Sequence, residues 1–260
     1  MKQLIILLLS IISINAMAQT VKLHSEAVSY KDGDTQLQGY LVYDESIKTP
    51  APGVLVVHEW TGINDYAKHR ADMLAELGYV AFAVDIYGID NLPKNVQEAA
   101  AIAGKFKDDR KLLRQRILLG LEELKKNPKV DLQKIAAIGY CFGGTTVLEL
   151  ARSGADIAGV VSFHGGLDTP TPEDAKNIKC KVLVCTGGDD PTVPPSQVEA
   201  FEKEMRDAGV DWQVKAYGGA VHSFTNPASG NDKSKGVAYN EKADKRSWED
   251  MKLFFNEIFK

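Results

Sequence analysis

Hydrophobic residues along this chain form short uninterrupted runs, and these runs alternate with segments in which apolar residues recur at helical spacing. Short apolar runs that are bounded by glycine, proline or aspartate are typical of buried strands. An N-terminal hairpin is expected from strands at 28–30 and 37–43 that meet at the turn 32–34. Further buried strands are expected at 53–57, 79–84, 135–138, 157–163, 182–186 and 214–217.

Helices are predicted between these apolar runs. Asp65 is expected to cap one helix, and two amphipathic helices are expected at 95–106 and 109–126. Ser196 and Glu199 have the spacing of a capping box at the start of a further helix. Strands that alternate with helices predict an α/β fold with a mostly parallel central sheet and helices on both faces. The apolar face of a C-terminal helix is expected at Trp248, Leu253, Phe254 and Ile258.

The N-terminus has the features of a secretory signal peptide. Lys2 supplies a positive start, 4–14 is apolar, and the small residues at 16–18 form a cleavage site. We therefore expect a signal peptide at 1–18 and a single domain at 19–260, exported to the periplasm or secreted. The alternative is a retained N-terminal anchor, but the apolar stretch is short for a membrane span. No later segment reaches about 20 apolar residues, so no membrane association is expected after cleavage.

Charge argues against one class of partner. The chain carries 31 lysines and arginines against 35 acidic residues, which gives a formal net charge of −4. Removal of Lys2 with the signal peptide leaves 30 basic residues against the 35 acidic ones, a net charge of −5. A mildly acidic chain without a basic stripe is not expected to bind nucleic acid. The sequence does not indicate an oligomeric state.

The most informative segment is Gly139-Tyr140-Cys141-Phe142-Gly143, which follows a predicted strand and precedes a predicted helix at 145–151. This Gly-x-nucleophile-x-Gly pattern is similar to the nucleophile elbow of α/β-hydrolases, with cysteine in place of serine. Such a turn is strained and lifts the nucleophile above the sheet, while the glycines let the strand and helix backbones approach closely. The alternative is a buried structural cysteine in a glycine-rich turn.

The cysteine count favours a reactive thiol. Three cysteines are an odd number for an oxidising compartment. Cys180 and Cys185 flank a predicted strand, and the extended chain places them about 16 Å apart, too far for a disulfide with each other. Cys141 is therefore not required as a bridge partner.

A cysteine nucleophile needs a base to accept its proton and a carboxylate to orient that base. In α/β-hydrolases these residues follow the nucleophile in the order acid, then histidine. His222 follows the last predicted strand, and Asp189 and Asp190 follow the strand before it. The residues alone leave both aspartates open as the acid, and leave His222 open as an ordinary loop histidine. His24 and His69 are expected at the surface.

The predicted strand at 53–57 leads into His58-Glu59-Trp60. A backbone N–H group from this loop, together with that of Phe142, is a candidate oxyanion hole. Glu59 is unexpected there, because a carboxylate disfavours the negative charge that develops nearby; the alternative is a solvated loop glutamate. A metal site at His58 and Glu59 lacks a third ligand at a recognisable spacing, so no metal is expected.

These motifs together resemble the dienelactone hydrolase family, and the resemblance extends over nearly the whole chain after the signal peptide. It implies that Asp190 is the acid of a Cys141–His222–Asp190 triad. It also implies that the N–H groups of Trp60 and Phe142 form the oxyanion hole. The resemblance is carried by four segments, at 58–60 with 62–64, 139–144, 190–194 and 222–224.

The resemblance also implies a role for Glu59. In the family, the equivalent glutamate contacts the resting thiol and helps to generate the thiolate when substrate arrives. A neighbouring carboxylate disfavours a resting thiolate, so Cys141 is expected to be largely neutral at rest.

Two departures from the family bear on the substrate. Members that cleave dienelactone hold its carboxylate with arginines, whereas the corresponding segments here, 85–89 and 222–226, contain none. Without a bidentate clamp, dienelactone itself is not the expected substrate. The segment 165–179 is short, so no large cap domain is expected over the site. The residues expected to line an open substrate site are Trp60, Tyr87, His164 and Phe224.

Together these features predict an exported cysteine-dependent hydrolase that cleaves a small-molecule ester or lactone through an acyl-cysteine intermediate. The expected catalytic residues are Cys141, His222, Asp190 and Glu59, and no cofactor is expected. Acyl transfer to a nucleophile other than water is a close variant. Two alternatives use the same fold: a non-catalytic binding protein, and a redox protein in which the thiol of Cys141 reacts with peroxide.

Overall fold

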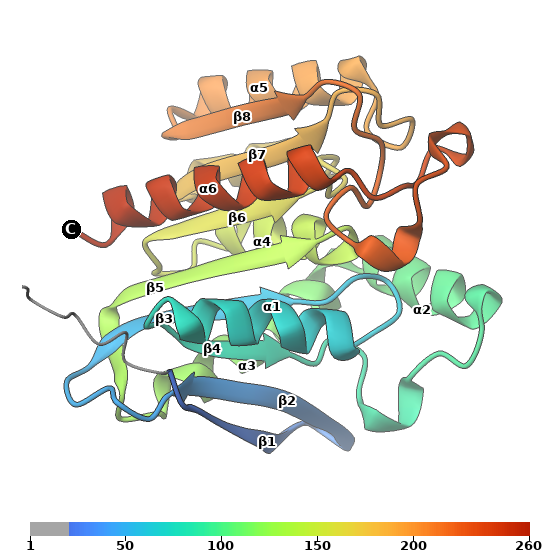
Figure 1. The fold of residues 1–260 in the computed structure, drawn as a ribbon. Coiled ribbons are helices and arrows are strands. Elements are labelled where there is room, and N and C mark those ends of the chain that lie inside the picture. Colours follow the sequence, from blue (N-terminus) through green and yellow to red (C-terminus); the bar gives the residue numbers. More distant parts are fainter. Residues whose placement is uncertain (1–20) are drawn as a thin grey trace, which may run out of the picture.

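The computed structural model describes residues 21–260, and its centre is an eight-stranded sheet with the order β1-β2-β4-β3-β5-β6-β7-β8 (Figure 1). The predicted signal peptide at 1–18 lies outside the described residues. The strands are β1 (Leu23–Asp32), β2 (Thr35–Asp44), β3 (Ala51–Val57), β4 (Val80–Val84), β5 (Val130–Tyr140), β6 (Gly159–Phe163), β7 (Lys181–Gly187) and β8 (Trp212–Tyr217).

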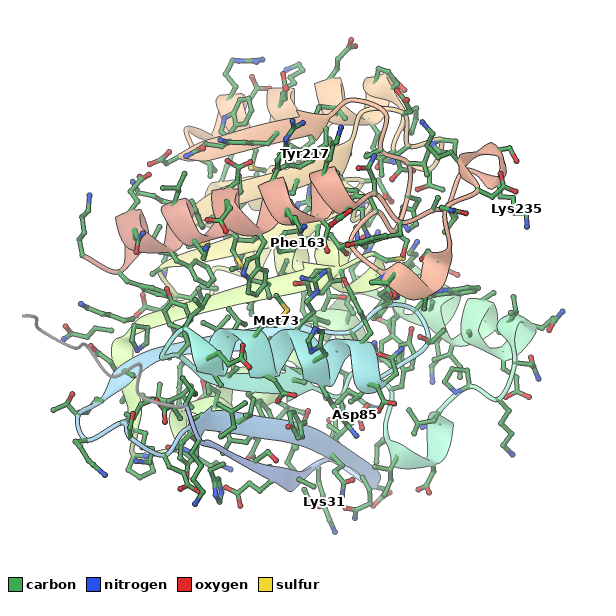
Figure 2. All side chains as sticks on the ribbon, viewed as in Figure 1. Lys31, Met73, Asp85, Phe163, Tyr217 and Lys235 are labelled. Carbon is green, nitrogen blue, oxygen red and sulfur yellow. The ribbon has the colours of Figure 1, made fainter. Side chains whose placement is uncertain are left out.

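The sheet is mostly parallel. β1 and β2 form an antiparallel hairpin, and β2 pairs antiparallel with β4. Every neighbouring pair from β4 to β8 is parallel. Lys31 lies on the edge strand β1 and projects into solvent, which hinders pairing with another chain (Figure 2). The predicted α/β fold, without a large cap domain, is confirmed.

The helices cover both faces of the sheet (Figure 1). Residues Leu74 of α1 and Phe255 of α6 are buried on one face, and Leu121 of α3, Val147 of α4 and Phe201 of α5 are buried on the other. None of the helices within residues 21–260 is long and apolar enough to cross a membrane. The helices are α1 (Asp65–Glu76), α2 (Val96–Asp108), α3 (Arg110–Lys125), α4 (Phe142–Arg152), α5 (Pro195–Ala208) and α6 (Glu241–Ile258), with 3-10 helices η1 (Ile89–Asn91), η2 (Pro172–Asn177), η3 (Pro227–Ser229) and η4 (Lys233–Lys235).

Two predicted helix starts are wrong. The cap of α1 is Asn64, whose side chain accepts a backbone N–H of the first turn, so Asp65 is the first helical residue. α5 begins at Pro195 after Pro194, so Ser196 lies inside the first turn and no capping box forms. Proline is favoured at the first helical position, because the N–H that it lacks has no partner there in any helix.

The apolar face of α6 differs from the prediction at one position. Met251, Phe254 and Phe255 are buried, whereas Leu253 is 65% exposed. α6 begins at Glu241, and its buried residues recur at steps of three and four positions, which leaves Leu253 on the solvent side.

Candidate active site

Cys141 occupies the turn between β5 and α4, at the carboxyl edge of the sheet. Its φ of 52° and ψ of −113° are a strained conformation for a residue other than glycine. The flanking glycines permit this turn. A Cβ atom on Gly139 would overlap the carbonyl oxygen of Gly143, and one on Gly143 would overlap that of Val57. The close approach of strand and helix lifts the partly exposed thiol of Cys141 to the edge of the sheet.

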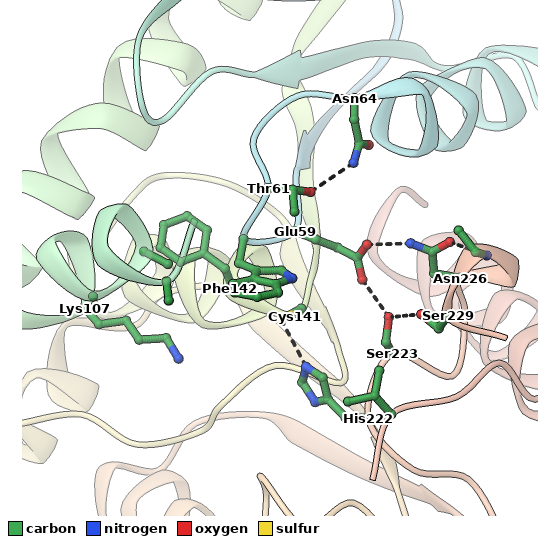
Figure 3. Close-up of a pocket in the computed structure, with 16 residues that line it drawn as sticks. Glu59, Thr61, Asn64, Lys107, Cys141, Phe142, His222, Ser223, Asn226 and Ser229 are labelled. Carbon is green, nitrogen blue, oxygen red and sulfur yellow. Dashed lines mark hydrogen bonds between the residues drawn. The ribbon is translucent and has the colours of Figure 1, made fainter. Parts of the chain in front are cut away.

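His222 lies between Cys141 and Asp190 and contacts both. Its Nε2 atom is 3.0 Å from Sγ of Cys141, and its Nδ1 atom is 2.9 Å from Oδ2 of Asp190. His222 belongs to the loop between β8 and α6, where its backbone N–H donates to the carbonyl of Gly236. Asp190 belongs to the loop after β7. Side chains from three different loops thus form one hydrogen-bonded line that ends at the thiol, and Figure 3 shows its last contact, between His222 and Cys141.

The neighbours of His222 decide its protonation. Burial by itself lowers the pKa of the imidazole, but the hydrogen bonds to Asp190 and Cys141 and the charges of these groups raise the pKa to about 10. Burial by itself raises the pKa of Asp190, but the hydrogen bond and charge of His222 and the bonds from Thr192 lower it overall. The imidazole therefore holds its second proton at neutral pH.

The two candidate aspartates occupy different environments. Asp190 is only 4% exposed and faces His222, whereas Asp189 is exposed in the turn. Thr192 adds a second link: its hydroxyl donates to Oδ1 of Asp190 at 2.7 Å and lies 2.9 Å from Nδ1 of His222. Its backbone N–H also donates to Oδ1, at 2.8 Å. Asp190 is therefore the aspartate that is placed to orient the histidine.

The loop after β3 holds the backbone of Trp60 in a defined orientation. Buried His58 accepts the N–H of Ile86 with Nε2, at 3.4 Å, so its Nδ1–H donates to the carbonyl of Glu59 at 2.6 Å. Burial lowers the pKa of His58, which keeps the ring neutral. The hydroxyl of Tyr87 donates to the carbonyl of Trp60 at 3.0 Å. Because N–H and C=O lie trans in a planar peptide, the fixed carbonyl of Glu59 also fixes the direction of the Trp60 N–H.

The side chain of Glu59 differs from what the resemblance implied. Its carboxylate accepts a hydrogen bond from the Ser223 hydroxyl at 2.9 Å and another from the Asn226 amide at 2.6 Å (Figure 3). The hydrogen-bond partner of the Cys141 thiol is instead His222. Glu59 is 7% exposed, so two neutral donors satisfy a buried carboxylate. The contact between Glu59 and the thiol that the resemblance implied is therefore not made as a hydrogen bond.

A cavity of about 630 Å³ opens beside Cys141. Its walls are mostly apolar, and α2 forms one side with Ala103 and Lys107. Within the described part of the chain, Lys107 is the only lysine that lines the cavity, and no arginine lines it (Figure 3). Phe142 also lines it, and as the first residue of α4 its N–H has no acceptor within the helix. The cavity therefore offers an apolar space next to an N–H donor and a thiol.

Three of the expected wall residues are not part of this cavity. Tyr87, His164 and Phe224 are 1%, 0% and 0% exposed. Tyr87 stacks on Phe106, and Phe224 packs edge-on against His164. Each of the three residues lies in a loop that follows a strand, but its side chain is buried beneath that loop instead of lining the cavity. Trp60, the fourth expected residue, is partly exposed and does line the cavity.

The other thiols and potential metal ligands do not form a second centre. In residues 21–260, no group of three or more His, Cys, Asp or Glu side chains is placed to hold a metal ion. All three cysteines are free. Cys180 and Cys185 are buried, and burial raises the pKa of each thiol to about 12. Cys141 is the one cysteine with access to the cavity.

Several residues at the site had no individual signal in the sequence. Thr192 lies inside a segment already singled out, and its place two residues after Asp190 is typical of a hydroxyl that bonds back to an aspartate. Asn226 lies in the segment 222–226, where the sequence pattern indicates no partner for Glu59. Lys107 lies on an ordinary amphipathic helix, and nothing in the pattern indicates that this helix borders the cavity.

Comparisons relate the chain to known proteins. The sequence profile of the Dienelactone hydrolase family matches residues 37–259. A crystal structure described as a dienelactone hydrolase-like promiscuous phosphotriesterase from metagenomic libraries is 42% identical, with a TM-score of 0.85 over 91% of this chain and 98% of its own. A "Putative carboxymethylenebutenolidase" of Aquifex aeolicus is 28% identical over 90% of this chain and 99% of its own. A "Probable 2-oxo-3-(5-oxofuran-2-ylidene)propanoate lactonase" of Bradyrhizobium is 30% identical over 66% of this chain and 73% of its own.

Proposed function

The chain belongs to the dienelactone hydrolase family, whose members act on esters or lactones, and we propose that it is an exported hydrolase that forms an acyl-cysteine on Cys141. The observation that carries this proposal is the line of contacts from Sγ of Cys141 through His222 to Asp190, at 3.0 Å and 2.9 Å. This line ends at a cavity large enough for a small ester. Nucleophile, base and orienting carboxylate within hydrogen-bond reach are the requirements of covalent acyl transfer.

Acylation begins with the imidazolium–thiolate pair. Sγ of Cys141 attacks the carbonyl carbon of the ester, and the carbonyl oxygen becomes an oxyanion. The backbone N–H groups of Phe142 and Trp60 stabilise this oxyanion in the mostly apolar cavity. His222 then gives its Nε2 proton to the leaving alkoxide, and the C–O bond breaks to leave an acyl-cysteine and an alcohol.

Deacylation uses the same groups in the reverse order. Neutral His222 accepts a proton from a water molecule, whose oxygen attacks the acyl carbon. The tetrahedral intermediate collapses, the C–S bond breaks and the carboxylic acid is released. Cys141 returns to the thiolate form and His222 to the imidazolium form. Asp190 keeps the imidazole in the tautomer that presents Nε2 to the reacting atoms.

Glu59 acts in this proposal through the loop that carries His222. Its carboxylate holds Ser223, the next residue in the chain, and Asn226 at the end of the same turn. Ser223 has a φ of 58°, a backbone conformation that needs outside support in a residue other than glycine. Glu59 is thus a positioning residue for the base, and its carboxylate oxygens already accept hydrogen bonds from two donors.

The cavity favours substrates without a carboxylate. No arginine lines it within the described residues, and the one lysine that does, Lys107, is an exposed point charge rather than a bidentate clamp. Small uncharged esters and lactones therefore suit the site better than dienelactone.

Export rests on the N-terminal sequence. Lys2, the apolar stretch at 4–14 and the small residues at 16–18 support a signal peptide at 1–18 and a periplasmic or secreted product. Expression of the full chain in a bacterium with two membranes should give a processed N-terminus near Gln19 in the periplasmic fraction. An unprocessed chain in the cytosolic fraction would contradict export and leave the chemistry untouched.

A panel of p-nitrophenyl esters and lactones tests the activity. The protein without residues 1–18 should hydrolyse short neutral esters, and Cys141→Ala should not. Rapid quenching during turnover should trap an acyl adduct on the Cys141 peptide, which mass spectrometry identifies. Turnover that survives in Cys141→Ala would overturn the mechanism.

A further inference from the structure

His164 is a strained and completely buried residue next to the proposed catalytic pair. It follows the last residue of β6, its φ is 40°, and its exposed fraction is 0%. A positive φ is costly for a residue other than glycine and persists only where the surroundings fix it. Because glycine would adopt this backbone conformation without cost, the contacts of the imidazole must explain why histidine occupies the position.

The ring of His164 contacts both partners of the catalytic pair. Its Nδ1 atom accepts the backbone N–H of Cys141 at 3.1 Å, and that N–H is shared with the carbonyl of Phe163 at 3.0 Å. The ring also packs edge-on against the ring of His222, with centroids 5.3 Å apart and planes at 69°. One side chain therefore contacts the nucleophile turn and the base at once.

The second ring nitrogen of His164 is anchored in turn. Because Nδ1 accepts a hydrogen bond, Nε2 carries the hydrogen and donates to the Thr225 hydroxyl at 2.7 Å. Burial lowers the pKa of His164 well below its ordinary value, so the ring is neutral and does not compete with His222 for a proton. Thr225 lies three residues after His222 in the same loop. His164 thus links the turn of Cys141 to the loop of the base through two directed hydrogen bonds.

Thr225 is fixed by a buried arginine between two helices. Arg70 of α1 donates from Nη2 to the carbonyl of Thr225 at 2.7 Å and pairs with Asp244 of α6 at 2.6 Å. The hydroxyl of Tyr66 lies 2.6 Å from that of Thr225 and accepts the Nε–H of Arg70 at 3.2 Å. The Arg70 guanidinium is also packed against an aromatic ring of Tyr66, at 5.2 Å from its centroid. This anchor ties the loop of the base to the helices on one face of the sheet.

We propose that His164, held by Thr225 and Arg70, is a positioning residue that fixes the nucleophile turn and the base loop relative to each other. Cys141 and His222 come from segments 81 residues apart, yet their reacting atoms must stay at 3.0 Å. Misplacement of a reacting group by about 1 Å can cost on the order of 100-fold in rate. This inference rests on the proposed function, because positioning has meaning only if the pair reacts.

The test uses an isosteric pair of variants at Thr225. Thr225→Val removes the hydroxyl with little change in shape, and Thr225→Ser keeps it. Thr186→Val is the matched control, since Thr186 is 2% exposed and its hydroxyl has no hydrogen-bond partner within the described residues. The readouts are kcat and KM for p-nitrophenyl acetate, the pH dependence of Cys141 alkylation by iodoacetamide, and the melting temperature.

We expect Thr225→Val to lower kcat and the alkylation rate near pH 7 by about 10- to 100-fold, with little change in KM. Thr225→Ser and Thr186→Val should stay within about twofold of the wild type, by the same reasoning about displacement. A folded Thr225→Val protein with the kcat and alkylation profile of the wild type would overturn the proposal. A merely structural role would lower the melting temperature without moving the alkylation profile, and that result would also overturn it.

His164→Asn provides a second variant if Thr225→Val does not fold. Asparagine tolerates a left-handed backbone and keeps an acceptor near the position of Nδ1, but it is too short to reach Thr225. Unchanged alkylation in a folded His164→Asn protein would overturn the inference. Alkylation needs no ester, so it tests positioning even if the wild type fails to hydrolyse every ester and the proposed function fails.

Discussion

The Asn226 amide donates to the carboxylate of Glu59 over 2.6 Å, and this bond joins the loop after β3 to the loop that carries His222. Each loop contributes to a different part of the proposed chemistry. The first presents the N–H of Trp60, and the second presents the base. The buried carboxylate of Glu59 is thus a connection between the oxyanion site and His222.

Replacement of Glu59 should loosen that connection. Glu59→Gln retains the shape but replaces one acceptor oxygen with an NH₂ group, which leaves Ser223 or Asn226 without its partner. An unsatisfied buried polar group costs about 1–3 kcal/mol, so we expect a lower free energy of unfolding and a lower kcat. Urea denaturation and ester kinetics measure both quantities. Glu173→Gln, at an exposed position, is the control.

Equal kcat values for Glu59→Gln and the wild type would reduce Glu59 to a residue of structural importance only. A kcat that falls together with a sharp rise in iodoacetamide reactivity at low pH would instead indicate that Glu59 acts directly on the thiol.

Substitutions in the proposed triad should lower kcat by different amounts, depending on which residue is replaced. Cys141→Ala and His222→Ala should abolish ester turnover and keep the fold, since one removes the nucleophile and the other the base. Asp190→Asn should lower kcat by on the order of 10²–10⁴, because the amide favours the wrong tautomer of His222. Asp189→Asn is the matched control, because Asp189 is exposed and the carboxylate that is hydrogen-bonded to His222 is that of Asp190. A larger loss in Asp189→Asn than in Asp190→Asn would reverse the assignment of the acid.

The raised pKa of His222 predicts how stability changes with pH. The pKa is raised from 6.5 to about 10, so the folded state binds the proton more tightly than the unfolded state. The resulting stabilisation is complete below about pH 6.5 and is lost as the pH rises through about 10. The difference in free energy of unfolding between the wild type and His222→Asn should therefore shrink from pH 6 to pH 10. His69→Asn, at an exposed position, should show no such trend.

Urea denaturation in the presence of a reductant measures this difference at each pH. A difference that grows with pH would mean that His222 is neutral in the folded protein, and the imidazolium–thiolate pair would then be excluded.

The sequence was sufficient for those features that depend on neighbours along the chain. The apolar run before Cys141 and the glycines around it identify a strand, a turn and a helix, and the structure has all three. Chain order placed His222 and the two aspartates at strand ends on the same edge of the sheet. Local pattern and topology are enough to bring such residues together, because parallel strands end at one edge.

The sequence was not sufficient where the direction of a side chain decides its role. His164 and Phe224 stand at positions from which a side chain can point into the cavity or under the loops, and both point under the loops. Glu59 follows β3, which is paired with the strand that leads to Cys141, but its carboxylate is hydrogen-bonded to donors in the loop of residues 223–226. These outcomes depend on contacts between loops distant in sequence, which no periodicity records.

The charges around the cavity predict a ranking of substrates. Lys107 is the only lysine that lines the cavity within the described residues, and no arginine lines it. Neutral p-nitrophenyl acetate should therefore have a higher kcat/KM than dienelactone, whose carboxylate finds only one exposed ammonium. Two unit charges about 4 Å apart in water interact by about 1 kcal/mol, which corresponds to about fivefold in kcat/KM.

Lys107→Glu tests whether the charge at this position affects the binding of substrates that carry a carboxylate. The substitution replaces attraction with repulsion, so kcat/KM for a carboxylate-bearing ester should fall by more than about fivefold, while that for neutral p-nitrophenyl acetate should change far less. Lys105→Glu is the matched control, because Lys105 is exposed on the same helix and does not line the cavity. Added salt should weaken the effect, since exposed charges are screened within about 10 Å at 0.1 M. If dienelactone were the better substrate and Lys107→Glu left that preference intact, its carboxylate would have to bind outside this cavity wall.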